Sequence, residues 1–523
     1  MRRREFVYGM GGLAGLTACE GFGSIIAGRQ QISASKVVGM YIHQHWPYNH
    51  PYAARTWTLE DYRGYADGLK KLGYNTLVIW PLLETMPNPL TPSDQANLEK
   101  IRQVIDMLHN ELGMRAFIAI CPNFVANKDA AKATFEKRHF FYSDKFVNPG
   151  DPAALKQMID WREKLLRPLA KMDAVTIIDS DPGGYPGSTN AQFVNLFEGH
   201  RKMLDQLRPG IDLIYWMHVG WEAYCRYYQT GKFAWGTPEA SVDILTRLQK
   251  VNPQPWGITI HTLNPPPNGT DLKLAERFGL AARSLAFNYG AIEGEPTFPM
   301  TNFGGNAAFQ GGKFSAPGGV VGNAQTHCVQ LPNTFAFARG ATKTAVPGEQ
   351  DYIQFADDLL HGRGPLIVEG WQALSAQDSE RMGVMAGKLE TAANERLEPG
   401  PLKGLLFGDP KRFLIDLAME LRLKGAYQEF VTASERSEGV KKPFGDFVET
   451  AEAWQQRNGY ECAWSFPKMA ESLKRLHSPS IDAVLDEQGK GKTPFDRIAD
   501  HYRITETYTP RLLAAMRETL KTL

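Results

Sequence analysis

The sequence predicts a (β/α)8 barrel followed by a mainly α-helical region, and two observations predict this architecture. Eight apolar, strand-like segments recur between residues 37 and 327, and most are followed by a helix-like stretch. Strands that alternate with helices form a parallel sheet, and eight such units suggest closure into a barrel. From about residue 350 the apolar spacing is helical, without a strand pattern. We therefore expect an export signal and linker over 1–35, a catalytic barrel over 36–345 and a helical domain over 346–523.

The predicted strands are short runs rich in β-branched and aromatic residues. They cover residues 37–43, 76–80, 116–121, 174–178, 213–217, 257–262, 284–288 and 319–325. The connection before the last strand, residues 294–318, is rich in Gly, Asn and Phe. Connections of this length are usually functional or mobile, so we expect a loop that folds over the mouth of the barrel.

The predicted helices have apolar residues at helical spacing, and two of them end at glycines suited to a C-cap, Gly73 and Gly113. Within the barrel they cover residues 59–72, 95–112, 152–172, 190–207, 238–251 and 272–283, and another begins at about residue 331. The helical region is predicted to contain helices over 352–360, 376–393, 410–422, 427–434, 444–457, 467–477 and 503–520.

The composition is that of a soluble globular protein, with 43% hydrophobic and 22% charged residues. The net charge is +1, from 58 basic and 57 acidic residues, which gives no reason to expect a nucleic acid or an acidic membrane as partner. The cysteines that follow residue 19 are widely spaced, without a zinc-binding pattern, and we expect buried free thiols; a disulfide formed after export is the alternative. We expect neither a metal nor another cofactor.

The N-terminus has the features of a bacterial export signal. Three arginines at residues 2–4 precede a Gly-rich apolar stretch over 7–18, and Arg3-Arg4 resembles a twin-arginine signal. Leu16-Thr-Ala-Cys19 resembles a lipobox, which would make Cys19 the site of a lipid anchor. An ordinary secretory signal or a disordered start is the alternative. We expect a periplasmic protein or a lipoprotein anchored to the outer membrane.

Two acidic residues close the fourth predicted strand, in Asp179-Ser180-Asp181. In an extended strand residues i and i+2 share a face, so both carboxylates are expected to face the mouth of the barrel. Two close carboxylates repel, which favours one proton donor and one anion, the pair that glycosidic cleavage needs. Gly183-Gly184 would allow close backbone approach, although an Asp before Pro-Gly-Gly also suits a turn or a helix N-cap.

On these residues and on the barrel pattern, the chain resembles the hexosaminidases of glycoside hydrolase families 20 and 84. The resemblance implies that Asp181 is the general acid and that Asp179 polarises the acetamido group of the substrate. In those families this acetamido group is the nucleophile. Family 84 has adjacent Asp-Asp and family 20 has Asp-Glu, whereas Ser180 separates the two acids here.

A second acidic pair, Glu293 and Glu295, follows the seventh predicted strand. Either residue is a candidate partner for Asp179 or Asp181 across the mouth of the barrel. A separation of ~5 Å would predict retention of configuration and ~6.5–9.5 Å inversion. The alternative is a solvated loop.

Polar and aromatic residues recur at successive strand ends, as expected of a carbohydrate pocket. Aromatic rings offer flat apolar faces for sugar rings, and His and Asn supply hydrogen bonds to hydroxyl groups. The candidate substrate-binding residues are His43, His45, Trp46, Trp80, Asn123, Tyr185, Trp216, His218, Trp221, His261, Asn288, Asn323 and His327.

The expected function is therefore an exported glycoside hydrolase with a carbohydrate substrate. One alternative is a metal-dependent amidohydrolase-like barrel that uses His43 and His45, with His218 and His261 as further ligands. Such barrels also use an Asp after strand eight and a Lys after strand four, and neither is present. Another alternative is a non-catalytic lipoprotein that binds carbohydrate and delivers glycans to a transporter.

Overall fold

The structure is a computed structural model that describes most of the chain after residue 35. The described residues are 36–44, 49–138, 145–180, 183–251, 256–260, 272–288, 290–292, 305–323, 331–342, 344–376, 378–436, 438–459, 469–486 and 510–523. Residues 36–523 form one compact unit. The predicted export signal and lipid anchor at Cys19 lie outside the described residues. Among the helices of the described part, none has the length and apolar character required to span a bilayer.

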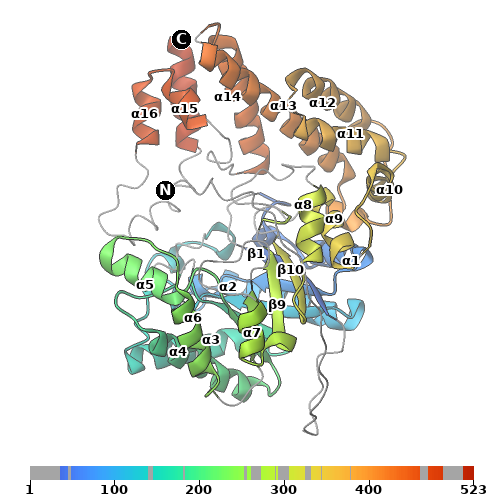
Figure 1. The fold of residues 1–523 in the computed structure, drawn as a ribbon. Coiled ribbons are helices and arrows are strands. Elements are labelled where there is room, and N and C mark those ends of the chain that lie inside the picture. The colour runs from blue at the N-terminus through green and yellow to red at the C-terminus, as the bar shows by residue number, and fades with distance from the viewer. Residues whose placement is uncertain are drawn as a thin grey trace. The chain divides into compact units, whose positions relative to one another are not determined.

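Eight parallel strands close into a barrel in the order β1-β10-β9-β8-β7-β6-β3-β2 (Figure 1). This arrangement confirms the predicted (β/α)8 fold. The strands are β1 (Val37–His43), β2 (Thr76–Trp80), β3 (Arg115–Ile120), β6 (Ala174–Ile178), β7 (Asp212–Trp216), β8 (Trp256–Ile260), β9 (Ser284–Asn288) and β10 (Gly319–Asn323). An antiparallel pair, β4 (Phe124–Val125) and β5 (Lys145–Phe146), lies in the connection after β3.

Helices connect the strands, and several begin with caps that the sequence encodes. Thr58 with Asp61, Thr91 with Asp94 and Thr189 with Gln192 each form a capping box that satisfies free backbone N–H groups. The helices are α1 (Leu59–Leu72), α2 (Pro92–Met107), α3 (Pro152–Leu166), α4 (Asn190–Leu207), α5 (Trp221–Thr230), α6 (Pro238–Leu248), α7 (Leu272–Arg277), α8 (Gly305–Lys313) and α9 (Leu331–Ala341).

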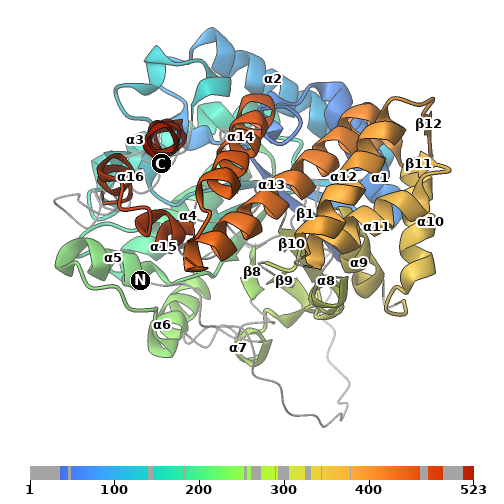
Figure 2. The ribbon, with the colours of Figure 1, turned by 90° about the horizontal axis from the view of Figure 1, so that it is seen from above.

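The chain after the barrel is helical, as predicted. It contains α10 (Glu349–Leu359), α11 (Gly364–Ser375), α12 (Ser379–Ala393), α13 (Pro410–Arg436), α14 (Lys441–Asn458), α15 (Met469–Lys474), α16 (Pro479–Leu485) and a last helical stretch over 510–522. Helices α11, α12 and α13 lie side by side (Figure 2). One short antiparallel pair, β11 (Leu360–His361) with β12 (Glu398–Pro399), interrupts the helices.

Part of the predicted loop 294–318 is a helix, a point on which the prediction was wrong. Helix α8 occupies Gly305–Lys313 and packs against α9. A Cβ atom on Gly312 would lie 1.9 Å from the backbone oxygen of Phe337, and one on Gly340 would lie 2.0 Å from that of Phe309. The glycines therefore allow two helices to pack closely, although in the sequence they resemble loop residues.

The helical region also differs from the prediction at Gly425. Helix α13 runs without a break through this residue, although we expected separate helices over 410–422 and 427–434. Gly425 is buried against Ser379 and Met382 of α12, and this packing offsets the low helix propensity of glycine.

The barrel and the helical region are joined by polar contacts and by a shared core. Tyr52, which precedes α1, donates a hydrogen bond to the buried carboxylate of Asp416 in α13 at 2.6 Å, and Arg457 donates to the same carboxylate at 2.6 Å. Apolar side chains from the barrel strands and from α10 to α13 form one continuous cluster. The predicted change of pattern near residue 346 is therefore not a break in the core.

Candidate active site

Three aromatic rings fill the inside of the barrel toward the carboxyl ends of its strands. The ring of Tyr41 in β1 lies 5.0 Å from that of Trp216 in β7 and 5.6 Å from that of Phe287 in β9. The rings of Trp216 and Phe287 are 4.1 Å apart. Strand residues alternate between the two faces, so these contacts fix which residues point inward. We call Tyr41, Trp216 and Phe287 the inner aromatic layer.

Among the described residues, some neutral polar atoms next to this layer find no hydrogen-bond partner. They are the indole nitrogen of Trp216, the hydroxyl of Thr259 and both amide atoms of Asn323. Asn323 is paired with Tyr41 in the register of the barrel, and Thr259 is paired with Trp216. A buried polar group without a partner costs about 1–3 kcal/mol. A bound group that both donates and accepts hydrogen bonds, whether a ligand or water, would satisfy these atoms.

The carboxylate of Asp179 is 1% exposed and accepts hydrogen bonds from four groups. Oδ1 accepts from the hydroxyl of Ser180 at 2.7 Å and from the backbone N–H groups of His218 at 3.2 Å and Gly220 at 3.3 Å. Oδ2 accepts from the hydroxyl of Tyr215 at 3.0 Å. Burial raises the pKa of Asp179, and these hydrogen bonds act in the opposite direction.

The position of Tyr215 shows on which side of the barrel wall the Asp179 carboxylate lies. Tyr215 and Trp216 are consecutive in β7, so their side chains leave opposite faces. The ring of Tyr215 lies 5.2 Å from that of Phe193 and 6.3 Å from that of Phe197, both in α4. The Asp179 carboxylate therefore makes its hydrogen bonds on the helix side of the barrel wall, where it holds the segment after β7. This arrangement differs from the prediction that the carboxylate faces the mouth of the barrel.

Gly184 and Tyr185, which follow Asp181 in the chain, are also held by hydrogen bonds. The amide group of Asn123 donates to the backbone oxygen of Gly184 at 2.6 Å and accepts from its N–H at 3.2 Å. The N–H of Tyr185 donates to the sulfur of Cys225 at 3.4 Å. Gly184 has a φ of +104°, which favours glycine. Asp181 itself lies outside the described residues, but the chain is anchored before and after it.

Glu222 is a candidate that the sequence analysis missed. It lies in the first turn of α5, six residues after Trp216, and one carboxylate oxygen accepts from the N–H of Thr237 at 2.7 Å. Burial raises the pKa of Glu222, and the negative charge of Asp179 raises it further. An acidic residue just after Gly220, past a barrel strand, was the available signal.

Glu84, which follows β2, is buried behind Trp80. Its carboxylate accepts from the indole N–H of Trp80 at 3.1 Å and from the N–H of Cys121. Burial raises the pKa of Glu84, and the nearby charge of Arg162 acts against this shift. These bonds give Glu84 a structural role at the ends of β2 and β3.

Other predicted substrate-binding residues lie outside the inner layer. Asn288 alternates with Phe287, so its side chain leaves the outer face, where it donates to the backbone oxygen of Phe314 at 2.9 Å. Trp221 is fully buried, and its indole N–H donates to the oxygen of Thr189 at 3.1 Å. His218 is half-buried beside Asp179. The predicted residues or side chains outside the described part are His43, His45, Trp46, Asp181, His261, Glu293, Glu295 and His327.

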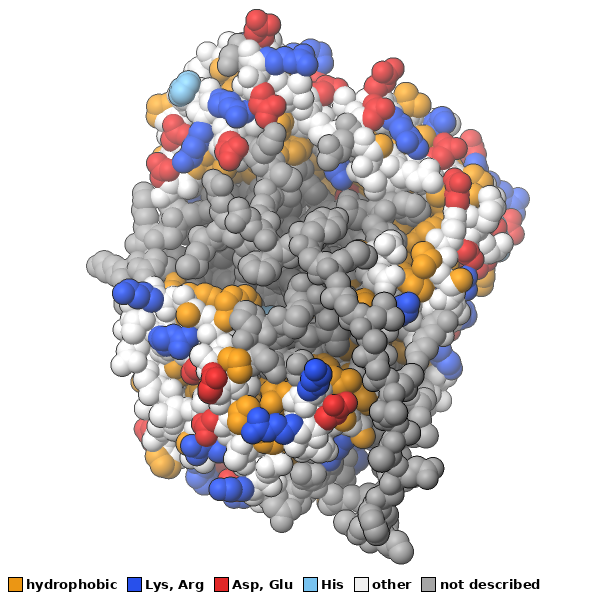
Figure 3. Space-filling model, viewed as in Figure 1, with side chains coloured by type: hydrophobic (Ala, Val, Ile, Leu, Met, Phe, Trp, Pro, Cys, Tyr) orange, Lys and Arg blue, Asp and Glu red, His pale blue; other side chains and the backbone are white. Residues whose placement is uncertain are grey.

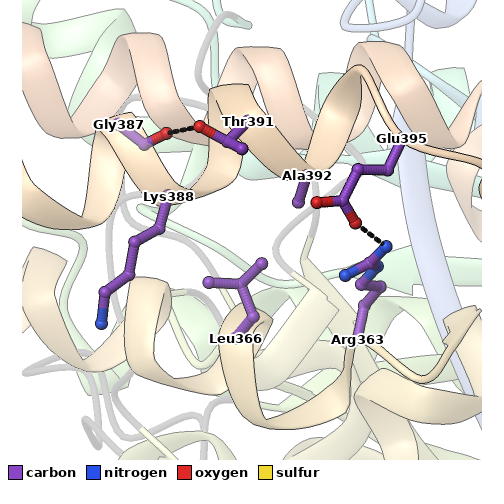
Figure 4. Close-up of a pocket in the computed structure, with 7 residues that line it drawn as sticks. All are labelled: Arg363, Leu366, Gly387, Lys388, Thr391, Ala392 and Glu395. Atoms are coloured by element: carbon purple, nitrogen blue, oxygen red, sulfur yellow. Dashed lines mark hydrogen bonds and ion pairs between the residues drawn. The ribbon is translucent and has the colours of Figure 1, made fainter.

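A groove in the helical region has a volume of about 590 Å³ and lies between α11 and α12 (Figure 4). Its charged groups are paired, since Arg363 forms an ion pair with Glu395 and Lys388 lies 3.6 Å from Glu369. The hydroxyl of Thr391 donates to the oxygen of Gly387 within α12 at 2.9 Å. The two ion pairs link the α11 segment with the α12 segment. Among the described residues we find no group of three or more His, Cys, Asp and Glu side chains placed to hold a metal ion.

No protein-family model and no curated protein matches the sequence. Solved structures that align with the chain include glycoside hydrolases. A family 89 glycoside hydrolase from Clostridium perfringens has 11% identity and a TM-score of 0.48, over 92% of this chain and 63% of that one. An O-GlcNAc hydrolase mutant from Thermobaculum terrenum has 10% identity and a TM-score of 0.45, over 93% and 95%. CpGH84B has 10% identity and a TM-score of 0.41, over 80% and 74%. Likenesses at this level say nothing about the chemistry of this chain.

Proposed function

We propose that the protein is an exported glycoside hydrolase that binds a neutral sugar at the carboxyl end of its barrel. The observation that carries this proposal is the inner aromatic layer together with the partnerless atoms of Trp216, Thr259 and Asn323. In this proposal Asp181 is the general acid. Asp179 is a positioning residue, because its carboxylate is occupied by four donors.

The chemistry of the inner layer matches a sugar ring. A pyranose has apolar C–H faces that pack on aromatic rings, and its hydroxyl groups both donate and accept. The indole of Trp216 donates, whereas the amide of Asn323 and the hydroxyl of Thr259 do both. The partnerless side chains are uncharged, which favours a neutral ligand over a phosphate or a carboxylate.

The acid needs a second carboxylate, for which there are three candidates. Glu293 and Glu295 follow β9, and Glu222 follows β7 with a pKa that burial has raised. If the substrate carries an acetamido group, as in the hexosaminidases that the chain resembles, that group would replace a protein nucleophile.

The test compares wild-type protein with Asp181→Asn on a panel of chromogenic glycosides that includes N-acetylhexosaminides. Loss of a general acid lowers the rate by about 10²–10⁴-fold when the leaving group is a poor one. A nitrophenol leaves readily, so its glycosides should lose much less activity than alkyl glycosides of the same sugar. Asp160→Asn, at an exposed position in α3, is the matched control and should keep full activity. Equal activity of Asp181→Asn and wild type on both substrates would exclude Asp181 as the acid.

A second candidate function is favoured by the bonds of Asp179. A carboxylate held in a hydrogen-bonded turn, away from the inner layer, also fits a carbohydrate-binding lipoprotein without activity. In that case no glycoside of the panel is cleaved, and oligosaccharides bind to wild type and to Asp181→Asn with equal affinity by calorimetry. Fractionation of cells that express the full chain, with Cys19→Ala as the comparison, tests both export and the lipid anchor.

A further inference from the structure

Trp235 is an exposed tryptophan on the connection between α5 and α6, and its side chain is 48% exposed. Its ring meets that of Phe233 edge-on at 5.9 Å and 73°. Phe233 in turn contacts Tyr224 and Tyr227 of α5 at 6.0 and 6.2 Å. The indole is thus supported by an aromatic cluster and leaves part of its surface to solvent. Hydrophobic side chains gather beside α5, next to basic side chains (Figure 3).

The backbone at Trp235 is fixed by hydrogen bonds on both sides. The guanidinium of Arg226 donates to the oxygen of Ala234 at 2.8 Å and to that of Trp235 at 3.2 Å. The N–H of Gly236 donates to the oxygen of Val219 at 2.9 Å. A ring on a fixed backbone loses little conformational entropy when a ligand covers it.

Two glycines bring this segment against the chain that follows β7. A Cβ atom on Gly236 would lie 2.8 Å from the oxygen of Val219. One on Gly220, whose φ is +103°, would lie 2.9 Å from the Cα of Gly236. Asp179 bonds the N–H of the same Gly220. The carboxylate that follows β6 therefore supports the segment that carries Trp235.

The position of Val219 places Trp235 at the carboxyl end of the barrel. Val219 follows Trp216 of the inner aromatic layer by three residues, which span at most about 11 Å of extended chain. The N–H of Gly236 donates a hydrogen bond to the backbone oxygen of Val219, and Trp235 precedes Gly236 in the chain. The exposed indole therefore lies near the carboxyl end of β7, the strand that contributes Trp216 to the inner aromatic layer.

We propose that Trp235 is the platform for a second sugar ring of an oligosaccharide, next to the ring bound at the inner aromatic layer. This inference rests on the proposed function. The exposed side chains of Lys232, Thr237 and Glu239 lie near the indole in the chain and would bond the hydroxyl rim of a pyranose. A protein or membrane partner needs a contiguous apolar patch of several hundred Å². Of the rings in this cluster, Trp235 is exposed, whereas Phe233 and Tyr227 are half-buried and Tyr224 is buried. One exposed ring with polar and charged neighbours fits a sugar better.

The experiment measures kcat/KM for a nitrophenyl monosaccharide and for the tetrasaccharide of the same sugar. Trp235→Ala should lower kcat/KM for the tetrasaccharide about tenfold, since a lost stacking contact is worth about one factor of ten in affinity. It should leave the value for the monosaccharide unchanged, and Trp235→Phe should restore most of the loss. Val384→Ala, at an exposed position of α12, is the control and should match wild type on both substrates.

Each outcome decides the proposal. Equal losses on both substrates, or no loss on either, would overturn the platform and leave the hydrolase proposal standing. If no glycoside is cleaved, calorimetry with chito-, cello-, xylo- and manno-tetrasaccharides replaces the rate measurement. Weaker binding by Trp235→Ala would then support the platform without the hydrolase. Unchanged binding by the variant, or no binding of any of them by wild type, would reject it.

Discussion

The hydroxyl of Tyr215 donates a hydrogen bond to Oδ2 of Asp179 at 3.0 Å, from a ring that packs against α4. The other oxygen of this carboxylate holds the N–H groups of His218 and Gly220. One buried acid therefore connects the ends of β6 and β7 with the helix layer. The segment that it holds leads to both Glu222 and Trp235.

Tyr215→Phe removes the donor to Oδ2 and leaves that oxygen buried. We expect the free energy of unfolding to fall by about 1–3 kcal/mol, which is the cost of a buried polar group without its partner. Urea denaturation at neutral pH measures the change. Tyr227→Phe removes the hydroxyl of a half-buried ring in α5 and should change stability by less than about 0.5 kcal/mol. Equal stability of Tyr215→Phe and wild type would show that this hydrogen bond does not hold the carboxylate.

Asp179→Asn and Asp179→Ala should differ in a defined order. The amide oxygen of Asn can keep the three donors at Oδ1, and its NH₂ group can donate to Tyr215, whose hydroxyl also accepts. Ala leaves every one of these donors without an acceptor, so we expect a loss of more than about 3 kcal/mol for Ala and a smaller loss for Asn. Thermal unfolding of both variants gives the order, and a more stable Ala variant would contradict it.

Glu222→Gln tests a pH dependence. Burial and the charge of Asp179 raise the pKa of Glu222 in the folded protein, so ionisation is easier in the unfolded chain. The contribution of Glu222 to stability is therefore fully present below its pKa in the unfolded chain. It is lost as the pH rises through its raised pKa in the folded protein. Gln keeps the acceptor for Thr237 and does not ionise. The variant should gain stability relative to wild type between pH 4 and pH 7.5, and urea midpoints at the two pH values measure this. A constant difference would refute the shift.

Much of this fold can be predicted from the sequence because the apolar spacing of a helix and the apolar runs of a strand are both local patterns. The barrel strands have compact apolar runs, and the parity of Phe287 and Asn288 could have shown that only one of them points inward. The bond between Tyr215 and Asp179 depends on the register of two strands, which no local pattern contains. Gly312 and Gly340 resembled loop residues because their close packing is a tertiary contact. Glu222 escaped attention because it follows its strand by several residues.

Asn323 and Asn123 are both fully buried asparagines, and replacing each by leucine should have opposite effects. The amide of Asn123 bonds Gly184 and Val147, so Asn123→Leu breaks a satisfied network and should cost more than about 2 kcal/mol. Both amide atoms of Asn323 find no partner within the described part of the chain, and an apolar group of similar shape removes that cost. Asn323→Leu should therefore leave the free energy of unfolding unchanged or raise it by about 1–2 kcal/mol. Replacing a buried polar group that serves function often has this effect.

The same Asn323→Leu variant should lose binding of whichever sugar the wild-type protein recognises, because the ligand is what satisfies the amide. Thermal unfolding measures stability, and calorimetry with that sugar measures binding. A gain or no change in stability together with lost binding assigns the amide to the ligand. A marked loss of stability would mean that Asn323 serves the folded barrel itself, and the proposed sugar site would lose one of the observations on which it depends.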